Sequence, residues 1–112
     1  KPFANAVARL IERAHAGRVV SSMSKAVRGG KVFIDWSQND DHKTTVAVYS
    51  LRARERPTVS TPVTWDEVDA AVKAGDAAML RFEAGQVLAR VARDGDLFAP
   101  LLTLQQEIPA LG

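Results

Sequence analysis

Asp35 is the residue of this sequence whose surroundings most suggest a chemical role. It lies in the segment KVFIDWS, residues 31–37, where the apolar Ile34 and Trp36 flank it. A carboxylate without a partner in an apolar core is costly, and a divalent cation is one partner that keeps it charged. The alternative is an aspartate at the end of a strand, which reaches solvent or pairs with a basic neighbour. Asp35 is therefore a candidate metal ligand, with the strand-end alternative left open.

Three arginines follow at every second position: Arg52, Arg54 and Arg56. On an extended segment, side chains with this spacing fall on one face. A row of planar guanidinium groups suits phosphate oxygens, to which each group can donate paired hydrogen bonds. The alternative is an exposed edge strand that its charge keeps soluble. The pattern thus indicates either a phosphate-binding strand or a protected sheet edge.

The other polar motifs suggest less chemistry. The turn 28–31 (RGGK) lacks the spacing of a P-loop, so its glycines are interpreted as turn residues. His15 and His42 have no partner at metal-ligand spacing and are interpreted as surface residues. The pair Asp40–Asp41 is interpreted as a solvated turn, because adjacent side chains of an extended chain point opposite ways. Residues 94–96 (DGD) have the spacing of a metal-binding DxD motif but resemble the turn that ends a helix.

Helical spacing and capping signals predict three helices. Apolar residues predict a first helix from about residue 2 to about residue 15. Thr64 and Glu67 form a capping box, in which each side chain satisfies a backbone amide of the first turn. The helix that it opens runs to about residue 73, and a third helix is predicted between residues 82 and 94.

Two segments have the composition of strands, residues 31–37 and 44–52. We expect an α+β fold: a small, mostly antiparallel sheet that carries Asp35 and Arg52, packed on helices from both ends of the chain. A chain of 112 residues has room for one small domain, so residues 1–112 are interpreted as a single, partial domain, with a frayed tail over 105–112.

Composition excludes several classes of protein. Hydrophobic residues make up 46% and charged residues 25% of the chain, the balance of a folded domain rather than a disordered one. The absence of cysteine excludes a disulfide scaffold, a cysteine-ligated zinc site, an iron–sulfur cluster and a thiol nucleophile. It also fits a reducing compartment, and we expect a cytoplasmic protein. No apolar run approaches the ~20 residues that a membrane helix needs, so no membrane partner is expected.

The small net charge of +2 is unevenly distributed. Residues 18–56 contain eight lysines and arginines against four acids, whereas residues 65–112 contain four against eight. A basic block suggests a polyanionic partner such as a nucleoside triphosphate or nucleic acid. The alternative is an ordinary solvated face.

Read continuously, residues 22–65 resemble the C-terminal part of the polymerase domain of bacterial DNA ligase D, a member of the archaeo-eukaryotic primase superfamily. The segments that carry the resemblance are KVFIDWSQN, KTTVAVYSLRAR and PVTW, and it continues through residues 82–97, FEAGQVLARVARDGDL. The resemblance implies a template-directed nucleotidyltransferase that acts in the end joining of double-strand breaks. Such domains add nucleotides, preferentially ribonucleotides, to DNA ends with Mn²⁺ or Mg²⁺.

The resemblance also implies a role for individual residues. The aspartate of DWSQN, here Asp35, is the third carboxylate of the family's metal site and would be catalytic. Gln38 and Arg52 would contact the triphosphate of the incoming nucleotide. Arg28 would lie near the active site and help to set its arrangement, and Arg54 belongs to the same nucleotide-binding motif. The partners implied are DNA ends and NTP or dNTP.

Two departures from the family bear on activity. Val48 directly precedes the YSLR motif, at the position where the family usually has proline (APYSLR). The family's whole domain is nearly three times as long, and its first two metal carboxylates lie upstream in a DxD-type motif. We therefore expect this chain to be the C-terminal half of a primase-polymerase core, with the N-terminal half as its partner. The chain alone is expected to be inactive. It is also expected to self-associate or to be marginally stable.

Two other functions are considered beside this one. The first is a degenerate, non-catalytic relative that binds nucleotide or DNA ends. The second is a structural or partner-binding module without a nucleotide role, and the combination of the basic block with Asp35, Gln38 and Arg52 argues against it. An upstream DxD segment in the intact gene would separate the catalytic form from the degenerate one.

Overall fold

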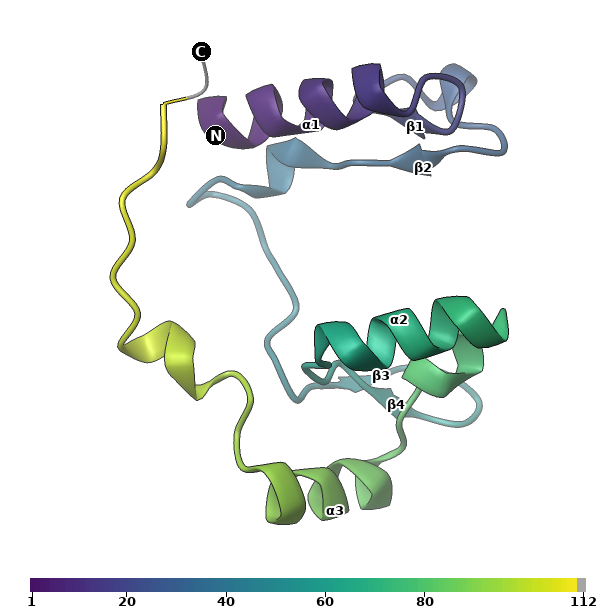
Figure 1. The fold of residues 1–112 in the computed structure, drawn as a ribbon, viewed down its shortest axis with the longest axis vertical. Helices are drawn as coiled ribbons and strands as arrows, with labels where there is room; N and C mark the ends of the chain where they lie inside the picture. Colours follow the sequence, from purple (N-terminus) through teal and green to yellow (C-terminus); the bar gives the residue numbers. More distant parts are fainter. Residues whose placement is uncertain (111–112) are drawn as a thin grey trace. The chain divides into compact units, whose positions relative to one another are not determined.

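A computed structural model of the chain describes residues 1–110 and divides into two compact units (Figure 1). Of the described residues, unit 1 comprises Lys1–Thr45 and residues 106–110, and unit 2 comprises Val46–Gln105. Three α-helices together with short strands confirm the predicted α+β class. Among the described residues, no helix combines the length and apolar character that crossing a membrane would need.

Unit 1 is built on one helix and one pair of parallel strands. Helix α1 (Pro2–Ala14) begins with proline, whose fixed φ suits a first helical turn. After it the chain reverses at Gly17, where a φ of 81° favours glycine, and enters β1 (Val19–Val20). Strand β1 pairs in parallel with β2 (Val32–Phe33), and the crossover between them contains the 3₁₀ turn η1 (Lys25–Val27).

The core of unit 1 lies where α1 packs on β1. Ala8 is fully buried, and Val20 is only 3% exposed. Small and β-branched side chains at these two points allow the helix to approach the strands closely. A second 3₁₀ turn, η2 (Trp36–Gln38), also packs on α1. The end of β2, where the candidate metal ligand lies, is thus held against this small core.

Unit 2 is built on an antiparallel hairpin and two helices. Strand β3 (Leu51–Arg52) pairs with β4 (Thr58–Val59), with Arg52 opposite Thr58. Helix α2 (Trp65–Ala74) opens with the predicted capping box and ends at Gly75, which has a φ of 64°. Three further elements follow: η3 (Ala77–Leu80), α3 (Ala84–Asp94) and η4 (Ala99–Leu102).

The core of unit 2 contains a buried charge. Ala71 and Val87 are its buried apolar residues, and Arg90 is only 9% exposed. Arg90 forms a bidentate ion pair with Glu67, donates to the carbonyl oxygen of Pro62 at 3.1 Å, and stacks over the ring of Phe82 at 4.2 Å. These partners satisfy a guanidinium group that would be costly if it were buried alone.

The strands differ from those predicted in length and in arrangement. Instead of one mostly antiparallel sheet, the described residues form two two-stranded sheets, of which one is parallel and one antiparallel. Residues 44–50 form no strand, because a strand requires a backbone partner and this segment finds one only from residue 49 onward. Residues 105–110 form no helix or strand; the predicted tail's last two residues, 111 and 112, lie outside the described part.

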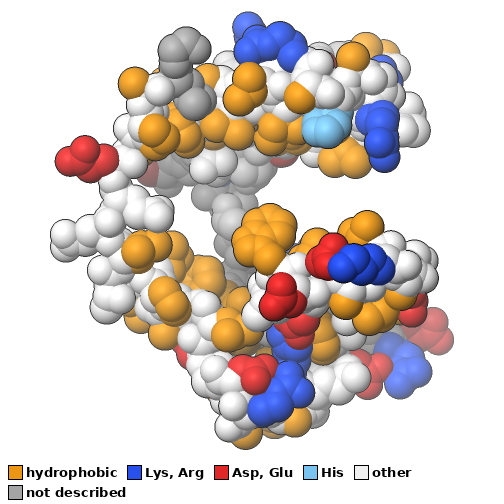
Figure 2. All heavy atoms as spheres, viewed as in Figure 1, with side chains coloured by type: hydrophobic (Ala, Val, Ile, Leu, Met, Phe, Trp, Pro, Cys, Tyr) orange, Lys and Arg blue, Asp and Glu red, His pale blue; other side chains and the backbone are white. Residues whose placement is uncertain are grey.

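Large hydrophobic side chains remain on the surface of both units (Figure 2). In unit 2, Trp65 is 85% exposed and Leu102 is 83% exposed. Exposed apolar side chains of this size favour association. The predicted self-association remains a prediction, and size-exclusion chromatography with light scattering tests it. A concentration-independent monomer would contradict it, and Trp65→Glu with Leu102→Glu is expected to reduce the association.

Candidate functional site

Asp35 lies at the end of β2, where the backbone turns away from the strand. Its φ of −81° and ψ of 77°, with a bond from the amide of Trp36 to the carbonyl of Ile34 at 3.0 Å, define an inverse γ-turn. This turn explains why the strand stops earlier than predicted. It also places Asp35 at an exposed position, so of the two interpretations left open the strand end describes its location and burial in a core does not.

Neighbours along the chain organise the carboxylate of Asp35. The hydroxyl of Ser37 donates to Oδ1 at 2.6 Å, and the side-chain amide of Gln38 lies 3.4 Å from Oδ2. The bond from Ser37 is the main cause of a lowered pKa of Asp35, and the Gln38 amide and the charge of Arg28 lower the pKa further. Asp35 is therefore an ionised, solvent-accessible carboxylate at neutral pH, a form suited to bind a cation.

Arg28 is fixed close to the same strand. Its guanidinium group lies 3.8 Å from the centre of the Phe33 ring, and Nη2 donates to the carbonyl of Met23 at 2.6 Å. Its Nε is buried and has no hydrogen-bond partner among the described residues. The remaining N–H groups on Nη1 and Nη2 can still bond to a further acceptor. The charge of Arg28 thus acts on Asp35, and its role in setting the active site stays a prediction.

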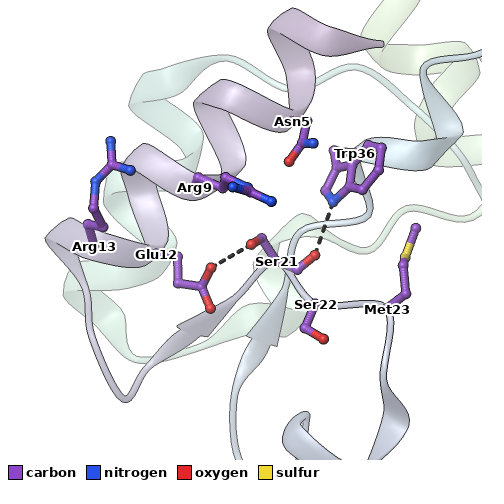
Figure 3. A pocket seen from close by; sticks show the side chains of 8 residues that line it. All are labelled: Asn5, Arg9, Glu12, Arg13, Ser21, Ser22, Met23 and Trp36. Atoms are coloured by element: carbon purple, nitrogen blue, oxygen red, sulfur yellow. Dashed lines mark hydrogen bonds between the residues drawn. The ribbon is translucent and has the colours of Figure 1, made fainter.

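A chain of hydrogen bonds holds the turn after Asp35 onto α1 (Figure 3). The indole of Trp36 donates to the carbonyl of Ser21 at 3.0 Å, and the hydroxyl of Ser21 donates to Glu12 at 2.5 Å. Ser21 directly follows β1 and is only 9% exposed. Beside these bonds is an open pocket of about 460 Å³, which Arg9 and Arg13 of α1 also line. The turn that follows Asp35 is thus tied through Ser21 to α1.

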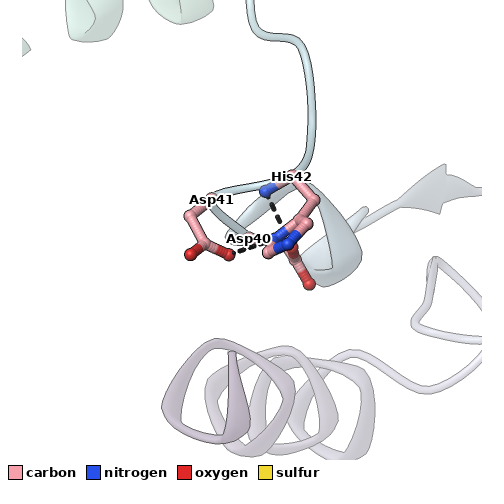
Figure 4. Close-up of side chains that lie close together, drawn as sticks. All are labelled: Asp40, Asp41 and His42. Atoms are coloured by element: carbon pink, nitrogen blue, oxygen red, sulfur yellow. Dashed lines mark hydrogen bonds and ion pairs between the residues drawn. The ribbon is translucent and has the colours of Figure 1, made fainter.

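A second cluster of potential ligands lies a few residues after Asp35 (Figure 4). Ligand atoms of Asp40, Asp41 and His42 lie within 4.8 Å of one another. The sequence analysis treated Asp40 and Asp41 as an extended pair and missed this proximity, which the tight turn creates. Lys1 already pairs with Asp40 at 2.5 Å and is the main reason why the pKa of Asp40 falls to about 2. The cluster is an ion-paired surface turn, as the solvated-turn interpretation implies.

The predicted phosphate-binding arginines lie in unit 2. Arg52 belongs to β3, and with Arg54 it lines an open pocket of about 360 Å³. Arg54 and Arg56 line a larger pocket of about 720 Å³ together with Arg81, which the sequence analysis did not single out. Arg56 pairs with Glu83 at 2.9 Å, so its charge is partly compensated. Of these three arginines only Arg52 lies in a strand, because the chain bends at residues 54–56, and no one pocket is lined by all three. The predicted row on one face of an extended segment was therefore wrong.

Each unit gathers part of the predicted site. Unit 1 brings Asp35, Gln38 and Arg28 to one strand end, and unit 2 brings Arg52 and Arg54 to one hairpin. The roles that the sequence assigned to these five residues stay predictions. Within the described residues, Asp35 belongs to no group of three or more carboxylate or histidine ligands.

Comparison with known proteins gives consistent matches. Residues 1–98 match the family model described as "LigD, primase-polymerase domain". The chain is 49% identical over 99 residues to the multifunctional non-homologous end joining protein LigD of Mycobacterium bovis, and 46% identical over 99 residues to that of Mycolicibacterium smegmatis. In both cases 88% of this chain matches 12% of the relative, so the chain spans about an eighth of these proteins.

A solved structure matches as well. The polymerase domain from Mycobacterium tuberculosis ligase D, in complex with DNA, superposes with a TM-score of 0.80 at 46% sequence identity. The match covers 93% of this chain and 34% of that chain.

Proposed function

This chain belongs to the LigD primase-polymerase domain family, and we propose that it supplies one metal-binding carboxylate and the triphosphate-binding arginines of a DNA-end-joining nucleotidyltransferase. In this reaction the 3′-hydroxyl of a DNA end would attack the α-phosphate of an NTP or dNTP, so that a nucleoside monophosphate is added and pyrophosphate leaves. The observation that carries the proposal is Asp35, an ionised carboxylate at a strand end whose oxygens lie against Ser37 and Gln38.

The chemistry of Asp35 fits a hard divalent cation. Mn²⁺ and Mg²⁺ prefer oxygen ligands, and a carboxylate with a lowered pKa stays available to them below neutral pH. A bound metal pair would neutralise charge on the transferred phosphoryl group and lower the pKa of the attacking hydroxyl. Asp35 would fill one position of that set. The remaining ligands would come from polypeptide outside these 112 residues, since the chain matches about a third of the solved domain.

The cationic groups suit the triphosphate. Arg52 and Arg54 present two guanidinium groups beside one pocket, and paired N–H groups of this kind match phosphate oxygens. The side-chain amide of Gln38 directs one N–H group toward Asp35 and would donate its second N–H group to a phosphate oxygen. DNA as the second substrate is supported by the matched polymerase domain, which was solved in complex with DNA.

A non-catalytic role is the second candidate. The observation that favours it is the isolation of Asp35, which forms no three-ligand cluster within the described residues. A chain with one such carboxylate can bind nucleotide or DNA ends through its arginines without holding two metals in register. The two candidates differ in whether the chain completes a polymerase when the rest of a domain is supplied.

Primer extension separates the two candidates. The chain alone, with Mn²⁺ and ribonucleotides, is expected to extend no primer. A chimaeric polymerase domain, in which residues 1–98 replace the matching segment of the M. tuberculosis domain, is expected to extend a DNA end. Extension by the chain alone that disappears with Asp35→Ala would contradict the first expectation. A folded chimaera that binds nucleotide but adds none would favour the non-catalytic role.

A further inference from the structure

Tyr49 has a backbone conformation that side chains rarely adopt. Its φ is 63°, and it is the one non-glycine residue with a positive φ between residues 1 and 110. For a bulky side chain this conformation is strained, and it persists only where surrounding contacts enforce it. Tyr49 directly precedes the segment Ser50–Arg52, which enters the arginine-bearing strand. The strain is therefore located at the start of the predicted phosphate-binding hairpin.

Backbone bonds connect Tyr49 to that hairpin. The amide of Tyr49 donates to the carbonyl of Ser60 at 2.6 Å, and the amide of Ser60 donates to the carbonyl of Ser50 at 2.9 Å. The next pairs of the ladder are Leu51 opposite Val59 and Arg52 opposite Thr58. Because the pairs succeed one another without a break, the direction of the backbone at Tyr49 sets the direction in which β3 begins.

The side chain of Tyr49 is tied to a residue far along the chain. Its hydroxyl donates to Oδ1 of Asp96 at 2.5 Å, and the same oxygen accepts the amide of Phe98 at 2.9 Å. The bond to Asp96 is the main cause of a raised pKa of Tyr49, which the charge of Arg90 partly opposes, and it lowers the pKa of Asp96. Asp96 belongs to the DGD turn, which has no other role in the proposed function.

The segment around α3 therefore holds the hairpin on both strands. Before α3, the carbonyl of Phe82 accepts the amide of Val59 in β4 at 2.8 Å. After α3, Asp96 holds Tyr49 at the start of β3. We propose that Tyr49 and Asp96 act as positioning residues for Arg52, because their bond fixes the strained turn from which the arginine-bearing strand extends. This inference rests on the proposed role of Arg52 in binding phosphate.

The test compares carboxylates two residues apart in the same turn. In the chimaeric domain, Tyr49→Phe and Asp96→Ala are each expected to weaken binding of inorganic triphosphate about three- to tenfold, the range of one lost hydrogen bond. Asp96→Asn keeps an acceptor and is expected to retain most of the affinity. Asp94→Ala is the matched control, because Asp94 pairs with Arg93 and makes no bond to Tyr49.

Two readouts separate positioning from a general structural role. In an Arg52→Ala background, Tyr49→Phe is expected to cause no further loss of triphosphate affinity, since it acts through the arginine. Tyr49 is the chain's one tyrosine, so ultraviolet titration of the 112-residue chain follows it alone. Its pKa is expected above 10.0, and Asp96→Asn is expected to lower it.

The possible outcomes each decide one point. If Arg52→Ala leaves triphosphate affinity unchanged, the proposed function of Arg52 fails, and with it the premise of the inference. If Arg52→Ala weakens binding but Tyr49→Phe and Asp96→Ala only lower the thermal unfolding midpoint, the positioning role is wrong. Equal losses from Asp94→Ala and Asp96→Ala, or a further loss from Tyr49→Phe in the Arg52→Ala background, would overturn it as well.

Discussion

The two candidate halves of the site are held in place by different kinds of contact. In unit 1, Asp35 is organised by Ser37 and Gln38, which lie two and three residues away along the chain. In unit 2, the arginine hairpin depends on bonds between distant residues: Tyr49 with Asp96, and Val59 with Phe82. A carboxylate site made of neighbours can be recognised from a short motif. A hairpin made of distant contacts is more easily disturbed from elsewhere.

The two units also differ in how far a substitution at a candidate residue is expected to change the stability of the fold. Asp35 is exposed, so replacing it leaves no buried group without a partner. Arg90 is almost buried, and replacing its partner Glu67 leaves a guanidinium charge uncompensated. Substitution of Asp35 in unit 1 is thus expected to affect activity alone, whereas unit 2 contains both residues expected to affect ligand affinity, such as Arg52, and residues expected to affect stability, such as Glu67. Four predictions test this division.

The largest expected effect is on catalysis by Asp35. In the chimaeric domain, Asp35→Ala is expected to reduce primer extension about 10³-fold or more, because one ligand of the metal site is lost. The thermal unfolding midpoint is expected to stay unchanged. Asp41→Ala removes an exposed carboxylate of the same unit and serves as the control, with near-normal extension expected. Near-normal extension by Asp35→Ala would show that the carboxylate has no catalytic role.

Next in size is the effect of Arg52 on nucleotide affinity. A charge-assisted bond to a phosphate contributes about 1.5–3 kcal/mol, so Arg52→Ala is expected to weaken nucleotide binding by about one to two decades. Arg56→Ala is the matched control: it removes the same charge, but its side chain is 83% exposed and already pairs with Glu83. Isothermal titration with a nucleoside triphosphate measures both. Equal losses would indicate a general effect of surface charge.

The ion pair of Glu67 and Arg90 is expected to stabilise unit 2. Glu67→Ala should lower the free energy of unfolding by about 2 kcal/mol, less than for a fully buried pair because the Glu67 side chain is 30% exposed. Lys73→Ala breaks an exposed ion pair with Asp69 on the same helix and should lower the free energy of unfolding by only about 0.3 kcal/mol. Denaturant unfolding of the two variants measures both losses of stability. Similar losses would contradict a special contribution of the pair of Glu67 and Arg90.

The same pair predicts a smaller dependence of stability on pH. The Arg90 bond is the main cause that lowers the pKa of Glu67 from 4.5 to about 2. A carboxylate with a lowered pKa in the folded state stabilises the protein above its ordinary pKa, and this stabilisation is lost as the pH falls towards the folded value. Unfolding midpoints should therefore fall between pH 4.5 and pH 2. Arg90→Met should flatten this slope, and an unchanged slope would exclude the pair as its source.

The sequence predicts the local features of this fold well. The first helix, the capping box of Thr64 and Glu67 and the helix end at residues 94–96 all depend on contacts within one or two turns of chain. Such contacts leave periodic or short-range signals that do not require knowledge of the rest of the fold. Membership of the primase-polymerase family was also evident, because the motifs that carry it are continuous segments.

The features that the sequence analysis missed depend on distant partners. No residue near Val19 in the sequence indicates that Val19 pairs in parallel with Val32. The length of each strand is set by how many of its residues find a backbone hydrogen-bond partner in another segment, which a local pattern does not contain. The apolar neighbours of Asp35 left open whether it is buried in a core or exposed at a strand end, and the γ-turn, which directs the chain out of the strand at that residue, decides for exposure. The bond between Tyr49 and Asp96 spans 47 positions and leaves no local pattern.

Metal binding by the chimaeric domain tests the central claim most directly. Mn²⁺ affinity, followed by the paramagnetic resonance of the free ion, is measured beside nucleotide affinity in Asp35→Ala and Arg52→Ala. We expect a crossed result: Asp35→Ala weakens Mn²⁺ binding at least about tenfold and leaves metal-free nucleotide binding intact, whereas Arg52→Ala weakens nucleotide binding and leaves Mn²⁺ binding intact. If Asp35→Ala binds Mn²⁺ as tightly as the unaltered domain does, the assignment of Asp35 to the metal site is wrong.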